Sequence, residues 1–246
     1  MTRESLQVQD VKSHERYRLP HPENIDPNGS QGKVLAWVPP AKKILELGPG
    51  PATITRHLKP ITEFLVCIEA DPAFAEETRP FCDELIRGNI EDPVTWERLR
   101  ALGYMYDLVI CADVLEHLVD PWAVLRTLKQ VLHPTGRILA SIPNIAHWSV
   151  RWELLRGHFK YQEEGLLDRT HLRFFTLSTI DQLFRETGYA ISRKTFTYNN
   201  DIGLFFRFLR GLGFTRPIER WANSHFPTLM SYQVIVEASP SGGDHP

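Results

Sequence analysis

The chain has 246 residues, of which 42% are hydrophobic and 24% are charged, and its formal net charge is −2. This composition is typical of a globular α/β protein of that length, and the near-neutral charge gives no reason to expect binding to a nucleic-acid backbone. The apolar runs are shorter than the roughly 20 residues of a transmembrane helix, and the polar N-terminus lacks the apolar stretch of a secretory signal.

Three cysteines, Cys67, Cys82 and Cys111, occur without CxxC spacing. Two of them lie in apolar runs typical of strands, FLVCIEA and LVICADV. We therefore expect buried thiols rather than disulfides or metal ligands. Unpaired thiols favour a cytoplasmic location.

Short apolar runs alternate with amphipathic stretches from residue 43 onward, a pattern that predicts a parallel sheet with helices on both faces. The predicted strands are residues 43–47, 64–70, 84–88, 106–112, 137–143, 190–197 and 232–238. The predicted helices are residues 31–38, 53–58, 72–84, 93–102, 122–132 and 177–188. We expect Gly136 to end the helix over 122–132. This order of elements is that of a doubly wound α/β fold.

Two segments interrupt the alternation, residues 144–176 and 199–230. Both follow the ends of predicted strands, where open α/β sheets place their substrates, so we expect them to be insertions in a main domain over 41–240. Residues 1–40 are polar and predict an N-terminal cap or lid, in which residues 17–31 either close over a cofactor or pack against the sheet edge. Residues 241–246 are expected to form a disordered tail.

The turn after the first strand reads ELGPGPA, over residues 46–52. Gly48 and Gly50 permit a sharp turn and a close approach of a ligand to the backbone. The third glycine of a dinucleotide fingerprint is absent and two prolines are present, which favours a cofactor without phosphates. Glu69 ends the second strand, where a carboxylate would accept hydrogen bonds from both ribose hydroxyls. The alternative is a solvent-exposed strand-end carboxylate.

The motifs ILELGPG, IEAD, RGNIED, YDLVICADVLEHLVDP and LHPTGRILASIPN follow one another over about residues 40–145. In this order the chain resembles class I S-adenosylmethionine-dependent methyltransferases. The resemblance implies a Rossmann-like, seven-stranded doubly wound sheet, mostly parallel with an antiparallel last strand, plus lid segments. It also implies that the cofactor is S-adenosylmethionine. The residues that it places around the cofactor are Glu46, Gly48, Pro49 and Gly50 at the methionine portion, Glu69 and Ala70 at the ribose, Asn89 and Ile90 at the adenine, and Ala112 and Asp113 beside the reacting methyl.

Methyl transfer to a hydroxyl requires a positioned acceptor and a base for its proton. Two histidines follow strand ends or insertions where such a base would lie: His147 in IPNIAHW and His171 in LLDRTHLRFFT. Asp168 would orient a neutral imidazole in the second motif. The alternative for each histidine is a structural role, in which it caps a helix or ties the loop to the core.

Asp113, Glu116 and His117 have i, i+3, i+4 spacing and would share one face if a helical turn starts at Asp113. The stretch CADVLEHLVDP is similar to the acidic and histidine-containing segment of ubiquinone-pathway O-methyltransferases, in which a divalent ion is bound, although Asp113 replaces a Glu of that pattern. The resemblance implies a divalent-metal site at these three residues, and oxygen-rich ligation with one imidazole would suit Mg²⁺ or Mn²⁺ better than Zn²⁺. The alternative is a metal-free site in which Glu116 pairs locally and His117 packs.

The aromatic residues over 148–159 and at 174–175 would line an acceptor pocket or belong to the core. The apolar and basic stretch over 203–210 predicts a lid or a homodimer contact, with peripheral contact to a membrane and a lipid-linked acceptor as the alternative.

The second half of the chain, with IPNIAHW and LLDRTHLRFFT, resembles methyltransferases of glycan and secondary-metabolite pathways. We therefore expect O-methylation of a sugar or another small hydroxylated acceptor. The alternatives are metal-assisted phenol O-methylation of the quinone type, N-methylation of an amine, and a non-catalytic regulatory module that binds S-adenosylmethionine. A nicotinamide dehydrogenase is the most distant alternative.

Overall fold

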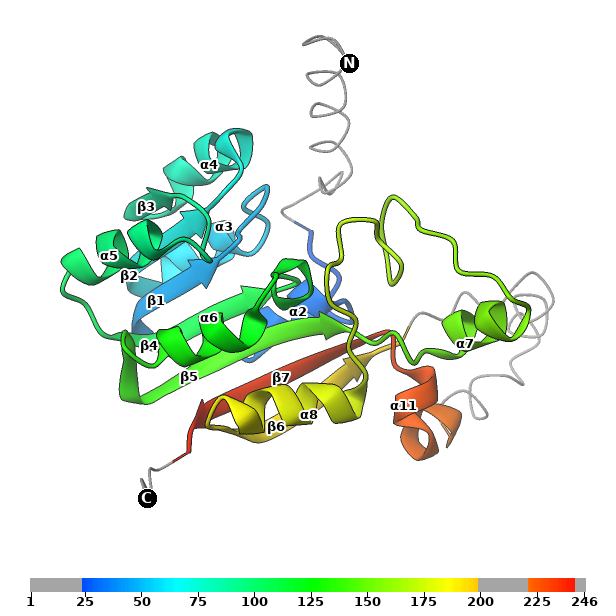
Figure 1. The fold of residues 1–246 in the computed structure, drawn as a ribbon. Helices are drawn as coiled ribbons and strands as arrows, with labels where there is room; N and C mark the ends of the chain where they lie inside the picture. Colours follow the sequence, from blue (N-terminus) through cyan, green and yellow to red (C-terminus); the bar gives the residue numbers. More distant parts are fainter. Residues whose placement is uncertain (1–23, 199–220, 242–246) are drawn as a thin grey trace, which may run out of the picture.

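This computed structural model describes residues 24–198 and 221–241, which form one seven-stranded sheet with helices on both faces (Figure 1). The strands are β1 (Ala41–Leu47), β2 (Thr62–Glu69), β3 (Glu84–Arg87), β4 (Tyr106–Ala112), β5 (Leu132–Pro143), β6 (Tyr189–Thr197) and β7 (Gln233–Pro240). Their order across the sheet is β3-β2-β1-β4-β5-β7-β6. Strands β1 to β5 pair in parallel, whereas β7 is antiparallel to both β5 and β6. The predicted fold, with its antiparallel last strand, is confirmed.

The central strands are buried because their sequences are continuous apolar runs. Residues 44–47 of β1 and 108–111 of β4 are all buried. Runs of this kind are typical of parallel strands that helices cover on both faces. The sheet therefore forms the middle layer of three.

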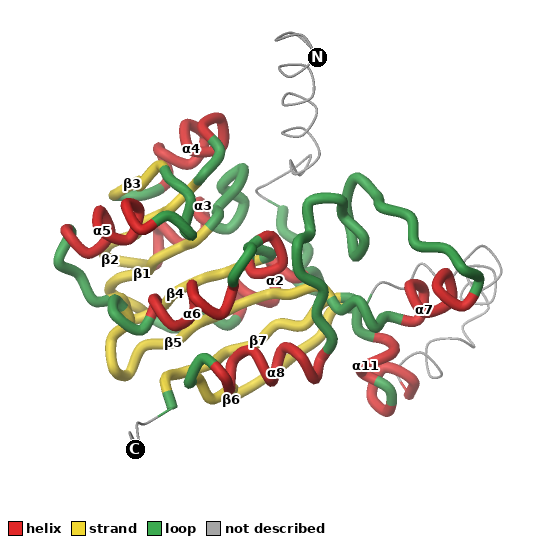
Figure 2. Tube along the Cα trace, in the orientation of Figure 1, coloured by secondary structure: helices red, strands yellow, loops and turns green. Residues whose placement is uncertain are grey.

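The helices are α2 (Ser30–Ala36), α3 (Thr55–Leu58), α4 (Pro72–Thr78), α5 (Pro93–Ala101), α6 (Pro121–Leu128), α7 (Trp148–Leu155), α8 (Leu177–Glu186) and α11 (Pro227–Met230). On one face of the sheet, α5, α6 and α8 contribute Trp96, Leu125 and Phe184 to the larger core cluster. On the other face, α2 and α3 contribute Val34 and Leu58 to a second cluster. Figure 2 shows the helices in red on the two sides of the yellow sheet.

An Asp-Pro pair begins each of the three helices that follow β2, β3 and β4. The Asp71, Asp92 and Asp120 side chains accept backbone N–H groups of α4, α5 and α6 at 2.7, 3.0 and 3.0 Å. The proline that follows each aspartate lacks an N–H, so the first turn has one donor fewer to satisfy. The starts of these helices are therefore determined locally, close to the strand ends that face the site.

Strand β5 begins earlier than the sequence predicts, at Leu132 rather than at residue 137. Leu132 pairs with Tyr106, and the register then shifts before Arg137 pairs with Leu108. The expectation that Gly136 ends a helix over 122–132 was wrong, because α6 already ends at Leu128 and Gly136 lies within β5.

Helix α4 is shorter than the predicted helix over 72–84. It ends at Thr78 and is followed by a 3₁₀ turn, Arg79–Phe81. Pro80 has no N–H, so it cannot continue the hydrogen-bond ladder of α4. A helix with this proline in its interior would lose a hydrogen bond, so the chain leaves the helix there.

The carboxyl ends of β4 and β5 point to the side where residues 144–176, α7 and α11 lie (Figure 1). Asn144, which is fully buried at the end of β5, ties these segments together. Its Nδ2 donates to the carbonyl oxygens of Thr228 and Ser231 at 2.9 and 2.8 Å, and its Oδ1 accepts from the Ala146 backbone N–H at 3.1 Å. The expected insertion over 144–176 thus leaves the sheet from a buried anchor.

Several expected segments lie outside the described residues: most of the cap over 1–40, the apolar and basic stretch 203–210, and the tail from 242 onward. Among the described helices, none has the length and apolarity that a membrane crossing requires. The three cysteines are free thiols; Cys67 and Cys111 are buried in β2 and β4, and Cys82 is half-buried.

Candidate active site

A cavity of about 490 Å³ opens at the carboxyl ends of β1, β2 and β4. All ten residues expected to contact the cofactor line it: Glu46, Gly48, Pro49, Gly50, Glu69, Ala70, Asn89, Ile90, Ala112 and Asp113. Of the remaining candidates only His117 lines it; Glu116, His147, Asp168 and His171 do not. Its volume is in the range of cofactor and small-molecule sites.

The turn after β1 needs its two glycines for backbone reasons. Gly48 and Gly50 have φ angles of +57° and +54°, in the left-handed region that side chains with a Cβ rarely adopt. A Cβ at Gly48 would also lie 3.0 Å from Cγ2 of Val114. A side chain at residue 48 would therefore crowd Val114 in the loop after β4 as well as strain the backbone of the turn.

Glu69 holds this turn from the neighbouring strand. Its Oε2 accepts the Gly50 N–H at 3.0 Å, and its Oε1 accepts the Asp71 N–H at 2.8 Å. Only 7% of the residue is exposed, so the solvent-exposed alternative does not apply. Burial raises the pKa of Glu69, and the hydrogen bonds from the backbone at Asp71 and Gly50 oppose the shift.

Glu46 lies deeper in the same cavity and is 2% exposed. Burial raises its pKa to about 7, and the nearby Thr55 hydroxyl and Cys67 thiol partly oppose that shift. The Cys67 thiol lies 3.8 Å from Oε2. This carboxyl group therefore titrates near neutral pH, where a nearby cation would favour its ionised form.

Asn89 and Ile90 follow β3 on the opposite wall of the cavity. The Oδ1 of Asn89 accepts the Glu91 N–H at 2.9 Å, and Ile90 is 7% exposed. Glu91 in turn accepts the backbone N–H groups of Val119 and Asp120 at 3.1 and 2.7 Å. The loops after β3 and β4 are thus joined along this wall.

Asp113 links three strands at the end of β4. Its Oδ1 accepts from Ser141 Oγ at 3.0 Å and from Gln233 Nε2 at 2.8 Å, which brings in β5 and β7. Its backbone has a φ of +54°. Burial raises the pKa of Asp113 to about 6, against hydrogen bonds from Ser141, Ser30 and Gln233.

The turn after Asp113 is a 3₁₀ helix over Leu115–His117, so no helical turn starts at Asp113 and the expected shared face is not formed. Glu116 instead points inward: it is 1% exposed, and neither of its carboxylate oxygens has a hydrogen-bond partner among the described residues. Burial raises its pKa well above the usual value, and the charges of Asp113 and Asp168 add to this. His117 lies beside it and reaches the cavity wall.

His147 caps α7. Its Nδ1 lies 2.8 Å from Ser149 Oγ and accepts the Ser149 N–H at 3.4 Å. Burial lowers its pKa to about 4, so the ring is neutral at pH 7. This geometry matches the helix-capping alternative, and the ring does not line the cavity.

His171 and Asp168 lie on the returning part of the insertion. The His171 ring packs edge-on against His117, with a centroid distance of 4.9 Å. Burial lowers the pKa of His171, the neighbouring His117 adds to this, and Asp168 opposes it.

Asp168 acts mainly on Thr170. Its Oδ1 accepts the Thr170 N–H and hydroxyl, both at 2.7 Å. The Thr170 carbonyl and hydroxyl oxygens each lie 3.2 Å from Nδ1 of His117. Asp168 thus orients His117 through Thr170, a connection that the sequence did not indicate.

A family model described as a methyltransferase domain matches residues 22–194. The chain belongs to this methyltransferase family. The methyltransferase is 28% identical over 117 residues to the ubiquinone biosynthesis O-methyltransferase of Cereibacter sphaeroides, which covers 43% of this chain and 43% of that protein. It is 26% identical over 102 residues to the mitochondrial counterpart of Schizosaccharomyces pombe, with 41% and 37% covered.

These matches span less than half the length of those relatives.

Among solved structures, the magnesium protoporphyrin IX methyltransferase of Synechocystis PCC 6803 with bound S-adenosylhomocysteine superposes with a TM-score of 0.56. The sequence identity is 16%, and 87% of this chain and 83% of that chain are covered. The methyltransferase thus has the fold of S-adenosylmethionine-dependent methyltransferases.

Several residues at the cavity were not among the expected site residues, and Gln31 and Gln233 are two of them. Gln31 of α2 lines the cavity, and Gln233 at the start of β7 binds Asp113. Gln31 lies in a predicted helix, but nothing in its local pattern indicates which face it presents. Gln233 is distant in sequence and reaches Asp113 only because β7 inserts between β5 and β6.

Proposed function

We propose that this methyltransferase transfers a methyl group from S-adenosylmethionine to a hydroxyl oxygen of a small acceptor, such as a sugar or a secondary metabolite. The observation that carries the proposal is that the glycine turn, Glu46, Glu69 and the strand ends all line one shared cavity.

The residues present fit this donor better than a phosphate-bearing cofactor. Pro49 and Pro51 have no N–H, so the turn offers fewer backbone donors than a phosphate-binding loop uses. Glu69 is a buried carboxylate whose oxygens have further lone pairs for ribose hydroxyls, and Glu46 supplies a negative charge for the ammonium of the methionine portion. Gly48 keeps the turn clear of a Cβ.

Bound S-adenosylmethionine supplies an electrophilic methyl carbon, so the chain itself needs to hold the acceptor in line and remove its proton. His117 is suited to the second task, because it lines the cavity and its Nδ1 faces the Thr170 carbonyl. A proton on Nδ1 puts the lone pair of the ring on Nε2, which would accept the hydroxyl proton. His171 packs behind this ring and positions it.

Phenol O-methylation is the second candidate. It is favoured by the names of the ubiquinone-pathway relatives and by the cluster of Glu116, His117 and His171 next to the cavity. Trp152, Phe159 and Phe174 are exposed but do not line the cavity, so they do not distinguish between the two acceptor classes.

The test has two arms. Calorimetry with S-adenosylhomocysteine and with NAD should show binding of the first alone; binding of NAD in its place would overturn the proposal. Transfer of labelled methyl to panels of sugars, phenols and amines should show product from a hydroxylated acceptor. Product from amines alone would instead establish N-methylation.

A further inference from the structure

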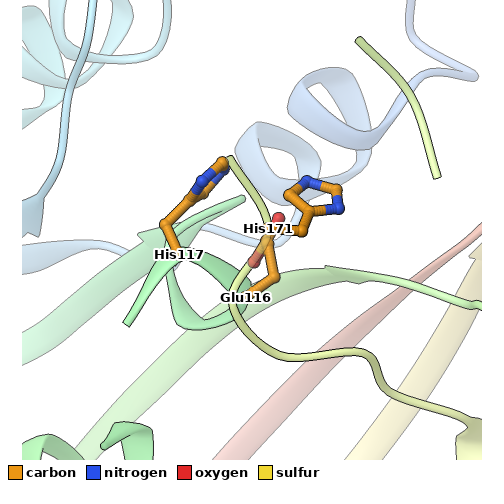
Figure 3. Close-up of side chains that lie close together, drawn as sticks. All are labelled: Glu116, His117 and His171. Atoms are coloured by element: carbon orange, nitrogen blue, oxygen red, sulfur yellow. The ribbon is translucent and has the colours of Figure 1, made fainter. Parts of the chain in front are cut away.

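Glu116, His117 and His171 bring three metal-ligating groups together beside the cavity. One ligand atom from each lies within 4.8 Å of the others. Figure 3 shows His171, on the returning part of the insertion, opposite Glu116 and His117 on the turn after β4. The two segments also share backbone contacts, since the Leu172 and Arg173 N–H groups donate to the Glu116 carbonyl at 2.8 and 2.9 Å. The cluster is therefore held by the fold on both sides.

Two of the three groups, Glu116 and His171, have buried polar atoms without a hydrogen-bond partner among the described residues. Both oxygens of Glu116, which is 1% exposed, and Nδ1 of His171, which is 9% exposed, lack a hydrogen-bond partner among the described residues. A buried carboxylate without a partner is costly, because it loses its hydration and gains nothing in return. A cation between the carboxylate and the two imidazoles would satisfy the Glu116 oxygens and Nδ1 of His171 at once.

We propose that Glu116, His117 and His171 bind one divalent transition-metal cation of the Zn²⁺ class. Two imidazole nitrogens and one carboxylate form a donor set typical of Zn²⁺ and its first-row neighbours, whereas Mg²⁺ prefers oxygen ligands alone. Three protein ligands leave at least one coordination position open, as in catalytic rather than structural zinc sites.

Asp113 is not a ligand in this arrangement. Its Oδ1 is occupied by Ser141 and Gln233, and it does not belong to the cluster. The third ligand comes instead from His171, which lies 54 positions beyond His117 in the chain. The metal would therefore tie the insertion to the end of β4.

The surroundings of His117 suit a metal ligand. Metal-bound histidines usually donate their second ring N–H to a carbonyl or a carboxylate, which fixes the tautomer. The Thr170 carbonyl lies 3.2 Å from Nδ1 of His117, and the Asp168 carboxylate accepts the Thr170 backbone N–H. This contact would direct Nε2 of His117 to the metal.

The proposal deepens the proposed function and rests on it for its chemical consequence. Because His117 lines the cavity, the open position of the ion would meet an acceptor oxygen there. A bound cation lowers the pKa of a coordinated hydroxyl, so the acceptor would release its proton to solvent water. In the metal-bound protein His117 would then be a ligand and not the base.

The test begins with the full-length protein freed of metal by a chelator. Calorimetric titration of this protein with Zn²⁺ alone should show one ion bound per chain. Titration with Co²⁺ in place of Zn²⁺ should give the visible absorption spectrum of a site with few ligands. Loss of a residue that only supports a metal ligand lowers metal affinity by roughly 10- to 100-fold. Glu116→Gln and His171→Ala remove ligands themselves, so they should lower the Zn²⁺ affinity by more than that. His147→Asn, at a buried histidine outside the cluster, and Asp113→Asn should leave it within a few-fold.

Unchanged Zn²⁺ affinity in His171→Ala, or absence of stoichiometric binding by the unsubstituted protein, would overturn the proposal. Loss of binding in Asp113→Asn equal to that in Glu116→Gln would do so as well, because it would assign the site to Asp113. Binding of S-adenosylhomocysteine and thermal unfolding are measured on every variant. If the protein binds no Zn²⁺ but still binds S-adenosylhomocysteine, the proposed function stands and only the ion is refuted.

Discussion

The carboxylate of Glu69 joins the end of β2 to the glycine turn after β1, since its Oε2 accepts the Gly50 N–H at 3.0 Å. Its other oxygen holds the Asp71 N–H at 2.8 Å, at the start of α4. One buried side chain thus sets the relative positions of two walls of the cavity.

Replacement of Glu69 by Ala should weaken binding of S-adenosylhomocysteine by about 1–3 kcal/mol, the range for losing hydrogen bonds to a charged group. Two backbone N–H groups would also lose their acceptor. Isothermal calorimetry measures the change. Glu84→Ala, at an exposed carboxylate at the start of β3, is the control and should bind as the unsubstituted protein does. A loss of only a few tenths of a kcal/mol in Glu69→Ala would remove the residue from the binding site.

Gly48→Val should abolish detectable binding of S-adenosylhomocysteine. The new Cβ would lie 3.0 Å from Val114 at a φ of +57°, and the side chain would crowd the cavity. Gly103→Val is the matched control, because Gly103 also has a positive φ, of +70°, but nothing lies within 4 Å of a Cβ there. Both variants should lose roughly 1–2 kcal/mol of stability through backbone strain. Only Gly48→Val should lose binding, and equal affinities would show that the turn does not contact the ligand.

The affinity for S-adenosylhomocysteine should rise with pH around neutrality because of Glu46. Burial raises its pKa from 4.5 to about 7, so the folded protein keeps a proton that the unfolded chain has already released. The stability that this group contributes is complete below pH 4.5 and is lost as the pH rises through 7. The ammonium group of the ligand pairs with the ionised carboxylate. The association constant should therefore rise by at most about tenfold for each unit that the pH increases below that pKa.

Calorimetry at about pH 6 and about pH 8 checks this effect. Glu46→Gln should bind more weakly and should lose the pH dependence. A pH slope in Glu46→Gln equal to that of the unsubstituted protein would show that another group is responsible.

His147 should make the protein sensitive to acid. Burial lowers its pKa from 6.5 to about 4, so in that interval the unfolded chain takes up a proton that the folded protein refuses. The free energy of unfolding therefore decreases as the pH falls through this interval, by up to about 3 kcal/mol. His147→Asn keeps an acceptor for the N-cap of α7 and removes the titration.

Urea unfolding at several pH values should show a smaller acid-induced loss in His147→Asn than in the unsubstituted protein. His133→Asn, at an exposed histidine of β5, should behave as the unsubstituted protein does. Identical curves for all three proteins would mean that His147 gains a proton without cost in the folded state.

Turnover should depend on His117 and not on His147. His117→Ala should lower kcat by roughly 10²–10⁴, the usual contribution of a positioned base, with little change in the affinity for S-adenosylhomocysteine. His147→Asn should remain within a few-fold, because its ring caps a helix away from the cavity lining. The reverse result would place the base at the end of β5.

Most elements of the fold were predictable because their causes are local. The continuous apolar runs at 44–47 and 108–111 are buried strands, and the glycine turn and Glu69 follow directly from the ends of β1 and β2. The start of β5 was not predictable, because Leu132 becomes part of the strand only by pairing with Tyr106 across a register shift.

In the site, too, local patterns predicted some features and long-range contacts decided others. The i, i+3, i+4 spacing of Asp113, Glu116 and His117 indicated a shared helical face, but the backbone of Asp113 adopts a positive φ, and its side chain binds Ser141 and Gln233. The contact between His117 and Thr170 joins residues 53 positions apart. No local pattern encodes such a contact.

By itself, the sequence indicated the central strands and the helix starts, because each depends on neighbours within a few positions. Its resemblance to class I methyltransferases indicated the residues that line the cavity at the ends of the parallel strands. Only the tertiary structure decided that His147 caps a helix while His171 meets Glu116 and His117. That choice depends on how residues 144–176 fold back over the end of β4, and this is set by packing between distant segments, such as the anchor of Asn144 on Thr228 and Ser231.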